Sequence, residues 1–262
     1  MSWNIDMRRC FPVLVLLVLA SCSVKEDRSG CPCRLEIIFT GEMAFPEVVL
    51  SATAGEALRL SETVRVKESG PVHEILVPRG MVSLSALEKF GQAAETSGLI
   101  RIRKGCQADS VYTCHLDVDC CSEAAEARVA TKKQFAAIHL RVMSADMGFS
   151  PGAKVRVTGN VDAFDPVTST PQHGEFEYVT ELDDGLACTF RVPRQLDSSL
   201  QVEITDVYGR PFPFEAGRHI ERYGYDWKED ALKDILLDID FNDSDYAITI
   251  ADWISGSLDE SL

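Results

Sequence analysis

The stretch Tyr112-Thr-Cys-His-Leu-Asp-Val-Asp-Cys120 alternates between apolar and polar residues. The apolar set is Tyr112, Cys114, Leu116, Val118 and Cys120, and the residues between them are Thr113, His115, Asp117 and Asp119. Successive side chains of a β-strand point to opposite faces, so a period of two places the apolar set on one face. The stretch therefore predicts a strand with one face against a core and the other in water.

The same alternation recurs along the chain on both sides of this strand. It is found over residues 35–39, 100–103, 138–142, 154–157, 186–192 and 200–204. Short strands separated by turn residues are typical of antiparallel sheets that pack face to face. We therefore expect an all-β fold built from antiparallel β-sandwiches. Two short helices are predicted beside the strands, over 88–96 and 227–235, with Asp226 as the N-cap of the second.

A short internal repeat indicates two related halves. Val77-Pro78-Arg79-Gly80 and Val192-Pro193-Arg194-Gln195 both follow a predicted strand and precede another alternating segment. A duplicated sandwich would contain such a strand-turn-strand unit once in each copy. Between residues 122 and 133 the strand pattern gives way to a stretch rich in Ala, Glu and Lys. The predicted division is a first sandwich over 34–130 and a second over 131–262.

The composition favours a folded chain and excludes nucleic acid as a partner. Hydrophobic residues make up 45% of the 262 residues, which is too large a share for a disordered chain. Nucleic-acid binding needs an excess of basic side chains that displace counterions from phosphates, whereas the formal net charge here is -15. An anionic membrane surface would repel the same charge.

The N-terminus has the pattern of a bacterial export signal. Arg8 and Arg9 precede an apolar run over residues 11–20. This run is about half as long as the roughly 20 residues that a helix needs to cross a bilayer. We therefore interpret residues 1–21 as a signal peptide that is removed, and not as a membrane span.

The signal ends in Leu19-Ala20-Ser21-Cys22, which resembles the lipobox of bacterial lipoproteins. In such proteins the cysteine thiol receives a diacylglycerol, the signal is cleaved, and acyl chains such as palmitate hold the new N-terminus at the membrane. Cys22 is therefore the predicted lipidation site. The alternative is a plain secretory signal with a chance cysteine at this position.

Residues 22–33 form the predicted tether between the lipid and the first sandwich. Within it, Lys25, Glu26 and Asp27 resemble the charged signal that directs lipoproteins of Bacteroides-type bacteria to the cell surface. The expected location is the outer membrane, with the protein on its extracellular face. Attachment through a lipid reconciles this location with the acidic charge.

The nine cysteines indicate neither a complete disulfide framework nor a metal site. Seven thiols remain once Cys10 is removed with the signal and Cys22 is lipidated, and an odd number leaves at least one unpaired. Zinc sites usually take two ligands from a turn with two to four residues between cysteines, whereas Cys120 and Cys121 are adjacent. We expect three thiols to be small buried hydrophobes because they fall on the apolar phase of strands: Cys114, Cys120 and Cys188.

Motifs of catalysis do not occur in the sequence. There is no nucleophile elbow, phosphate-binding loop or dinucleotide fingerprint. Asp238, Asp240 and Asn242 mimic the start of a calcium loop, yet they alternate with apolar residues as the wet face of a strand would. The chain is therefore expected not to be an enzyme. No catalytic residue, metal or cofactor is predicted apart from the covalent lipid on Cys22.

The N-terminal run from Cys22 through Cys31-Pro32-Cys33 to Leu35 resembles the fimbrillin-associated anchor family of the FimB type, minor fimbrial lipoproteins of Bacteroides and Porphyromonas relatives. Other segments resemble the family's second domain: 133–136, 157–165, 174–176, 190–195, 225–235 and 248–253. The resemblance implies two tandem transthyretin-like β-sandwiches. It further implies an anchor or accessory subunit that fixes a fimbria to the outer membrane, with fimbrial structural subunits as partners.

Subunits of this kind would join by β-strand exchange, in which main-chain hydrogen bonds supply affinity and alternate side chains enter pockets. The candidate exchanged segments are the terminal ones, 34–40 and 246–253, since chain ends swap without threading. The alternative is that both are ordinary strands of their own sandwich. A rival function is a stand-alone surface adhesin or glycan-binding lipoprotein. It is less favoured because the chain has only three Trp, and Trp3 lies in the signal.

Overall fold

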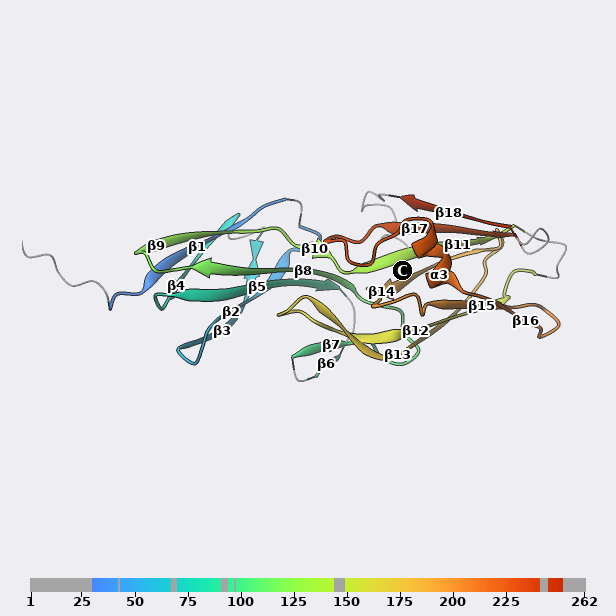
Figure 1. Cartoon of the computed structure of the whole chain (residues 1–262), viewed down its shortest axis with the longest axis horizontal. Helices are drawn as coiled ribbons and strands as arrows, with labels where there is room; N and C mark the ends of the chain where they lie inside the picture. Colours follow the sequence, from blue (N-terminus) through green and yellow to red (C-terminus); the bar gives the residue numbers. More distant parts are fainter. Residues whose placement is uncertain are drawn as a thin grey trace, which may run out of the picture.

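The structure is a computed structural model of the chain and describes residues 30–41, 43–66, 70–90, 94–96, 98–143, 149–240 and 245–251. It contains two β-sandwiches that follow one another along the long axis of the molecule (Figure 1). The predicted signal peptide, residues 1–21, and the greater part of the predicted tether lie outside the described residues.

The first sandwich has two sheets. One has the order β4-β1-β9 and the other β10-β8-β5-β2-β3. These strands are β1 (Cys33–Phe39), β2 (Glu47–Ala54), β3 (Leu58–Arg65), β4 (Val72–Val77), β5 (Met81–Phe90), β8 (Ser110–Asp119), β9 (Ala124–Val129) and β10 (Lys132–Lys133). Both sheets send apolar side chains into one core between them.

The second sandwich also has two sheets and its own core. One sheet has the order β14-β11-β17-β18, and the other β16-β15-β12-β7-β6 with β13 also paired to β12. The strands are β6 (Ala94–Thr96), β7 (Leu99–Arg101), β11 (Phe135–Val142), β12 (Lys154–Asp165), β13 (Thr170–Glu181), β14 (Ala187–Pro193), β15 (Gln201–Thr205), β16 (Pro211–Phe214), β17 (Asp234–Asp240) and β18 (Asp245–Ala251). The hairpin β6–β7 precedes β8 in sequence yet joins the sheet of the second core through β12.

The two sandwiches repeat one topology. In the first, β1 pairs with β4 antiparallel and with β9 parallel, and in the second β11 pairs in the same way with β14 and β17. Likewise β2 lies between β3 and β5, and β12 lies between β13 and β15. The Val-Pro-Arg segments occupy the equivalent crossings between sheets, from β4 to β5 and from β14 to β15. The internal repeat in the sequence thus marks corresponding corners of a duplicated fold.

Strand β1 shows how the alternating sequence produces the core. Cys33, Leu35 and Ile37 are fully buried, whereas Arg34 on the other face is exposed. Fully burying a side chain such as Leu or Ile contributes roughly 1.5–3 kcal/mol, so this strand supplies a substantial part of the first core. Because β4 and β9 flank it, both sides of its backbone are hydrogen-bonded.

Strand β8 follows the predicted alternation only over its second half. There Val118 is buried, and Asp117 and Asp119 are exposed. In the first half Thr113, predicted to face solvent, is buried, and its hydroxyl lies 3.0 Å from that of Ser169. The burial of Thr113 has a tertiary cause, because the loop between β12 and β13 of the second sandwich covers this part of β8.

Neither predicted helix is found in the described residues. The described part of the predicted helix over 88–96 is extended, because Glu88 continues β5 and pairs with Tyr112 of β8. Over 227–235, the Asp226 carboxylate accepts a hydrogen bond from the Lys228 amide at 2.8 Å, but it closes a turn instead of starting a helix. Tertiary partners override local helix propensity in both segments.

The helix of the described residues is α3 (Ala216–Arg222), which lies beside β15. Its Ala216 and Ile220 are fully buried in the second core. In the segment over 227–235, the carbonyls of Trp227 and Asp230 accept hydrogen bonds from the Arg194 guanidinium instead of from helix amides. Those carbonyls would otherwise accept the hydrogen bonds of a helix.

Candidate functional site

The residues predicted to carry the lipid lie outside the described part of the chain. They are Leu19, Ala20, Ser21 and Cys22 of the lipobox and Lys25, Glu26 and Asp27 of the export signal. The described chain begins at Gly30 and enters β1 at the end of the first sandwich that is farthest from the second (Figure 1). Residues 22–30 span at most about 30 Å when extended. A lipid on Cys22 would therefore hold this end of the molecule near the membrane.

None of the described helices is long and apolar enough to cross a bilayer. The described residues also contain no group of three or more His, Cys, Asp or Glu side chains that could hold a metal ion.

The two segments expected to take part in strand exchange have different surroundings. Segment 34–40 lies almost wholly in β1, between β4 and β9, so its exchange would break two ladders. Segment 246–253 includes most of β18, which among the described strands pairs with β17 alone and forms the edge of its sheet. Trp253 lies outside the described residues. Among the two chain ends, β18 is thus the one with a free backbone edge.

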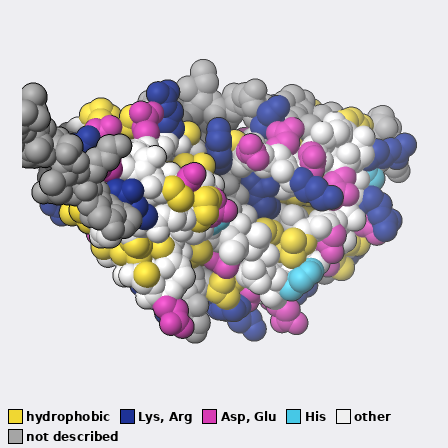
Figure 2. Space-filling model, turned by 60° about the vertical axis from the view of Figure 1, so that its left-hand side comes forward, with side chains coloured by type: hydrophobic (Ala, Val, Ile, Leu, Met, Phe, Trp, Pro, Cys, Tyr) yellow, Lys and Arg dark blue, Asp and Glu magenta, His cyan; other side chains and the backbone are white. Residues whose placement is uncertain are grey.

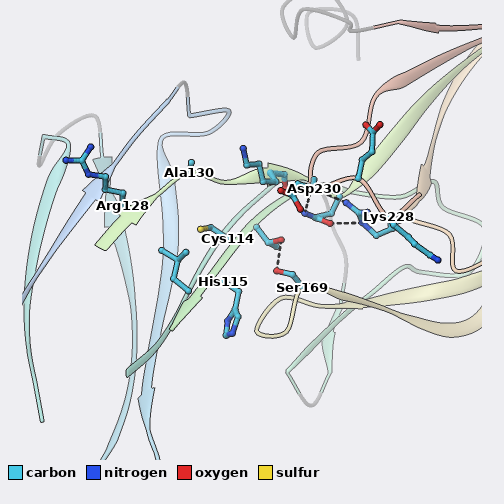
Figure 3. Close-up of a pocket in the computed structure, with 13 residues that line it drawn as sticks. Cys114, His115, Arg128, Ala130, Ser169, Lys228 and Asp230 are labelled. Carbon is cyan, nitrogen blue, oxygen red and sulfur yellow. Dashed lines mark hydrogen bonds between the residues drawn. The ribbon is translucent and has the colours of Figure 1, made fainter. Parts of the chain in front are cut away.

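A cleft of about 450 Å³ opens where the two sandwiches meet (Figure 3). Strand β8 and the loop after β9 form one wall, and the other includes the tip of the β12–β13 hairpin and the turn at 228–230. The lining residues are Thr113, Cys114, His115, Leu116, Arg128, Ala130, Lys132, Gln134, Ser169, Arg194, Lys228, Glu229 and Asp230. No local pattern in the sequence predicts this cleft, because its walls come from parts of the chain that are far apart.

The hairpin tip reaches the first sandwich through a tight turn. Ser169 adopts a left-handed backbone with φ of 54°, which is unusual for a residue other than glycine. The Asp165 carboxylate accepts a hydrogen bond from the Val167 amide at 2.9 Å and stabilises the turn. This geometry directs the Ser169 hydroxyl toward Thr113 of β8 (Figure 3).

Arg194 organises the opposite wall of the cleft. Its Nε donates to Gln134 Oε1 at 2.8 Å, and its other nitrogens donate to the carbonyls of Trp227 and Asp230. Burial lowers the pKa of this guanidinium. Because its donors are used within the protein, Arg194 holds the turn that carries Lys228 in place and serves a structural role.

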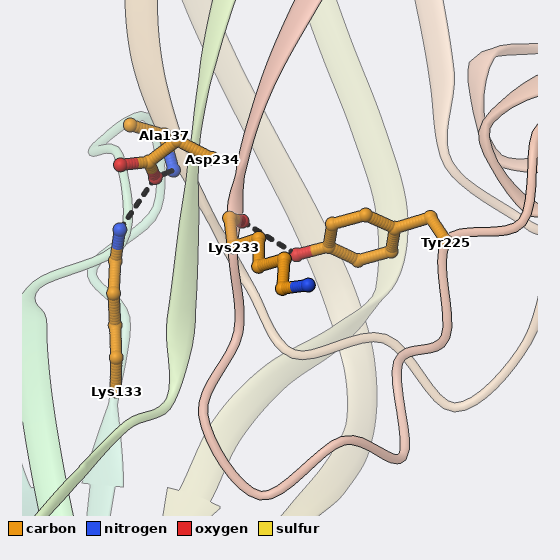
Figure 4. A network of polar contacts seen from close by, with 5 residues as sticks. All are labelled: Lys133, Ala137, Tyr225, Lys233 and Asp234. Carbon is orange, nitrogen blue, oxygen red and sulfur yellow. Dashed lines mark hydrogen bonds and ion pairs between the residues drawn. The ribbon is translucent and has the colours of Figure 1, made fainter. Parts of the chain in front are cut away.

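A second polar network connects the segment between the sandwiches to β17 (Figure 4). Asp234 Oδ1 accepts hydrogen bonds from Lys133 Nζ at 2.5 Å and from the Ala137 amide at 2.7 Å. The Asp234 residue is only 5% exposed. Nearby, the Tyr225 hydroxyl donates to the Lys233 carbonyl at 2.7 Å, and burial raises the pKa of this phenol. The network fixes the position at which the chain passes into the second sandwich.

The face drawn in Figure 2 carries basic and acidic side chains next to one another. Exposed ion pairs among the described residues include Arg65–Glu47, Arg141–Asp238 and Arg156–Glu177.

The duplicated sandwich topology has similar counterparts among solved structures, although the sequences differ widely. No family model matches the chain, and no curated protein matches its sequence. Among solved structures, the fimbrial anchor protein Mfa2 from Porphyromonas gingivalis is similar, with a TM-score of 0.54 and 14% identity over 85% of this chain and 98% of that one.

Two Bacteroides proteins have similar structures. A Bacteroides ovatus protein classed as an adhesin has a TM-score of 0.58 and 11% identity over 88% of this chain and 96% of its own. A Bacteroides thetaiotaomicron protein classed as polysaccharide-binding has a TM-score of 0.58 and 10% identity, over 84% and 96%. The fold expected from the sequence is therefore confirmed, and the neighbours include a fimbrial anchor, as the family resemblance implies.

Proposed function

We propose that this chain is a non-enzymatic lipoprotein of the outer cell surface that anchors a fimbria or serves as its accessory subunit. The observation that carries the proposal is the match to a fimbrial anchor over 98% of that protein's length. The lipobox-like sequence at Cys22 supports it, because an anchor needs an attachment to the membrane. The export signal at Lys25, Glu26 and Asp27 supports display on the extracellular face.

The arrangement of the two sandwiches suits this role. The tether enters the first sandwich at one end of the long axis, and β18 lies on the second sandwich (Figure 1). We propose that the sandwiches act as two domains, divided near residue 130. The first then stands close to the membrane, and the second is presented to the fimbrial subunits.

Strand exchange at β18 is the proposed mode of assembly. The outer backbone edge of Asp245–Ala251 faces away from β17, the strand to which it is bonded. An extended segment of another subunit could add to this edge, or β18 could itself pair with a partner sheet. Strand β1 is a weaker candidate because two ladders and a buried face hold it.

A photo-crosslinking amino acid at Ala247 of β18 is expected to capture a fimbrial structural subunit in cells. The matched control is the same amino acid at Glu62 of β3, which is also an edge strand but belongs to the first sandwich. Crosslinked bands would be analysed by mass spectrometry. Capture from Glu62 alone, or equally from both positions, would argue against assembly through β18.

Deleting the gene tests the anchor role itself. Fimbriae of the deletion strain should be shed into the medium, with their lengths on electron micrographs no longer limited, and the intact gene should restore attachment. Fimbriae as firmly attached and of unchanged length without the protein would disprove the anchor role.

A second candidate function is glycan binding, which the cleft between the sandwiches favours. Its volume of about 450 Å³ is within the range of small-ligand sites, and its lining offers hydroxyl, amide and cationic groups. If the cleft binds sugars, the mature chain should bind a glycan array without fimbrial subunits, and a Lys132→Ala, His115→Ala double variant should lose most of that signal. Both side chains are exposed, so the variant should fold normally. Unaltered binding by the variant would place the glycan elsewhere.

A further inference from the structure

Two buried cysteines meet at the tethered end of the first sandwich. Cys33 opens β1, Cys120 directly follows β8, and both are fully buried in the first core. The two thiols are neighbours, because burial and then the adjacent Cys33 thiol raise the pKa of Cys120. The two residues are far apart in sequence and belong to opposite sheets, so the contact is created by the fold.

The strand registers explain why these two residues meet. Cys33 is opposite Val77 at the end of β4, and Asp119 is opposite Met81 at the start of β5. The short corner 78–80 joins Val77 to Met81 and carries the chain from one sheet to the other. The Cys120 amide donates to the Gly80 carbonyl in this corner at 2.8 Å. Cys33 and Cys120 therefore flank a single corner, one from each sheet.

Arg79, at the centre of the corner, also holds the two cysteine segments together. Its Nε donates to the Cys31 carbonyl at 2.9 Å, and its Nη1 donates to the Cys121 carbonyl at 3.2 Å. One guanidinium thus binds the chain just before it enters β1 and just after it leaves β8. The segments that carry the two buried thiols are therefore fixed relative to each other at this corner.

We propose that Cys33 and Cys120 form a disulfide in the mature protein and that this bond joins the two sheets of the first sandwich at the tether. The described cysteines are free thiols in the present structure. Forming the bond removes two protons and two electrons from the pair of thiols. A disulfide donor, such as an oxidised dithiol oxidoreductase of the cell envelope or oxidised glutathione, accepts both and is reduced to two thiols.

The other described cysteines fit this pairing less well. Cys31 and Cys121 are exposed beside the corner, and Cys106 is exposed in a loop. Cys114 packs against the first core opposite Ala86 of β5, and Cys188 packs against the second core, in the other sandwich. One bond between Cys33 and Cys120 leaves five thiols in the chain after Cys22.

The bond should form while the protein folds, before the two sheets close over the sulfurs. In the folded chain burial raises the pKa of Cys120 to about 11, so the thiolate that attacks a disulfide is scarce near neutral pH. Solvent also cannot reach either residue, since both are fully buried. Reduced protein that has already folded should therefore oxidise slowly, and protein folded with a disulfide donor should contain the bond.

The position of the bond gives it a mechanical role, and this consequence rests on the proposed function. A pull on a fimbria would be transmitted from the lipid through the tether to Cys33, the first residue of β1. Without a covalent link, main-chain hydrogen bonds and side-chain burial hold that strand. With the link, load passes directly from Cys33 to β8 in the opposite sheet.

The test is to map thiols in the lipoprotein purified with detergent from the bacterial envelope. Free thiols are alkylated under denaturing conditions, and the protein is digested and analysed by mass spectrometry before and after reduction. A peptide joining Cys33 to Cys120 is expected, with five thiols alkylated before reduction and seven after it. Alkylation of all seven without reduction, or a bond that joins other cysteines, would overturn the proposal. The mapping does not depend on fimbrial attachment, so it can fail or succeed independently of the proposed function.

Thermal unfolding provides a second measurement with matched variants. Adding a reductant should lower the unfolding midpoint of the wild-type protein by about 10 °C, because the bond closes a long loop of chain. The midpoint of Cys33→Ala or Cys120→Ala should not respond to the reductant, whereas Cys188→Ala should respond as the wild type does. An equal response in all four proteins would show that the stabilisation does not come from this pair.

Discussion

Replacing Cys22 with alanine is expected to remove the lipid and release the protein from the membrane. Each methylene buried in a bilayer contributes about 0.8 kcal/mol, so two or three acyl chains give stable attachment without any apolar patch on the protein. An acidic chain of formal charge -15 has no electrostatic attraction to anionic lipid that would compensate. In cells given labelled palmitate, the C22A protein should carry no label and should leave the membrane fraction.

The matched control is Cys31→Ala, which changes an exposed cysteine outside the lipobox. This variant should incorporate palmitate and stay in the membrane fraction as the wild type does. If the C22A protein kept its label, or remained in the membrane fraction, the chain would be held there by something other than a lipid on Cys22. The interpretation of 19–22 as a lipobox would then be wrong.

Replacing Asp234 with alanine is expected to destabilise the second sandwich by about 3–5 kcal/mol, which is a large part of the stability of a typical domain. The loss arises because one carboxylate oxygen serves both Lys133 Nζ and the Ala137 amide. Without it, a mostly buried ammonium and a buried N–H group have no counterpart. The measurement is denaturant unfolding of the soluble mature chain, followed by tryptophan fluorescence, since Trp227 is buried in the same sandwich.

Asp238→Ala is the matched control for this measurement. It removes a carboxylate from the same strand, β17, and breaks an ion pair to Arg141 of the neighbouring strand β11. The Arg141 side chain is half exposed, so water replaces its lost partner and the destabilisation should be much smaller. Equal losses in the two variants would show that burial of the pair does not determine its contribution.

Much of this fold could be predicted from local sequence. Leu35 and Ile37 in β1 and Val118 in β8 are buried as the alternation requires, because the pleat of a strand alone determines which side chains share a face. The strand pattern also accounts for the spacing of Asp238. Its neighbours Leu237 and Ile239 are buried, and its own side chain pairs with Arg141. The Val-Pro-Arg repeat correctly indicated two related halves, since each copy lies at the same crossing between sheets.

The candidate sites depended on contacts that local sequence does not encode. Thr113 has the spacing of a solvent-facing residue, and only the hairpin tip at Ser169 makes it a buried wall of the cleft. Glu88 lies in a segment with helical composition, yet pairing with Tyr112 extends it. Its carboxylate accepts a hydrogen bond from the Phe45 amide at 3.0 Å. In each case the deciding partner is far away in the chain.

The sequence by itself determined the all-β fold, the buried face of strands such as β1 and the expectation of a lipid at Cys22. These features depend on the period of the side chains or on a short contiguous motif. Only the tertiary structure decided that β1 lies inside its sheet while β18 forms an edge, and that Cys33 meets Cys120. The reason is physical: strand order and contacts between sheets arise from pairing between distant segments, and period-two patterns are nearly alike in all strands and do not specify the partner.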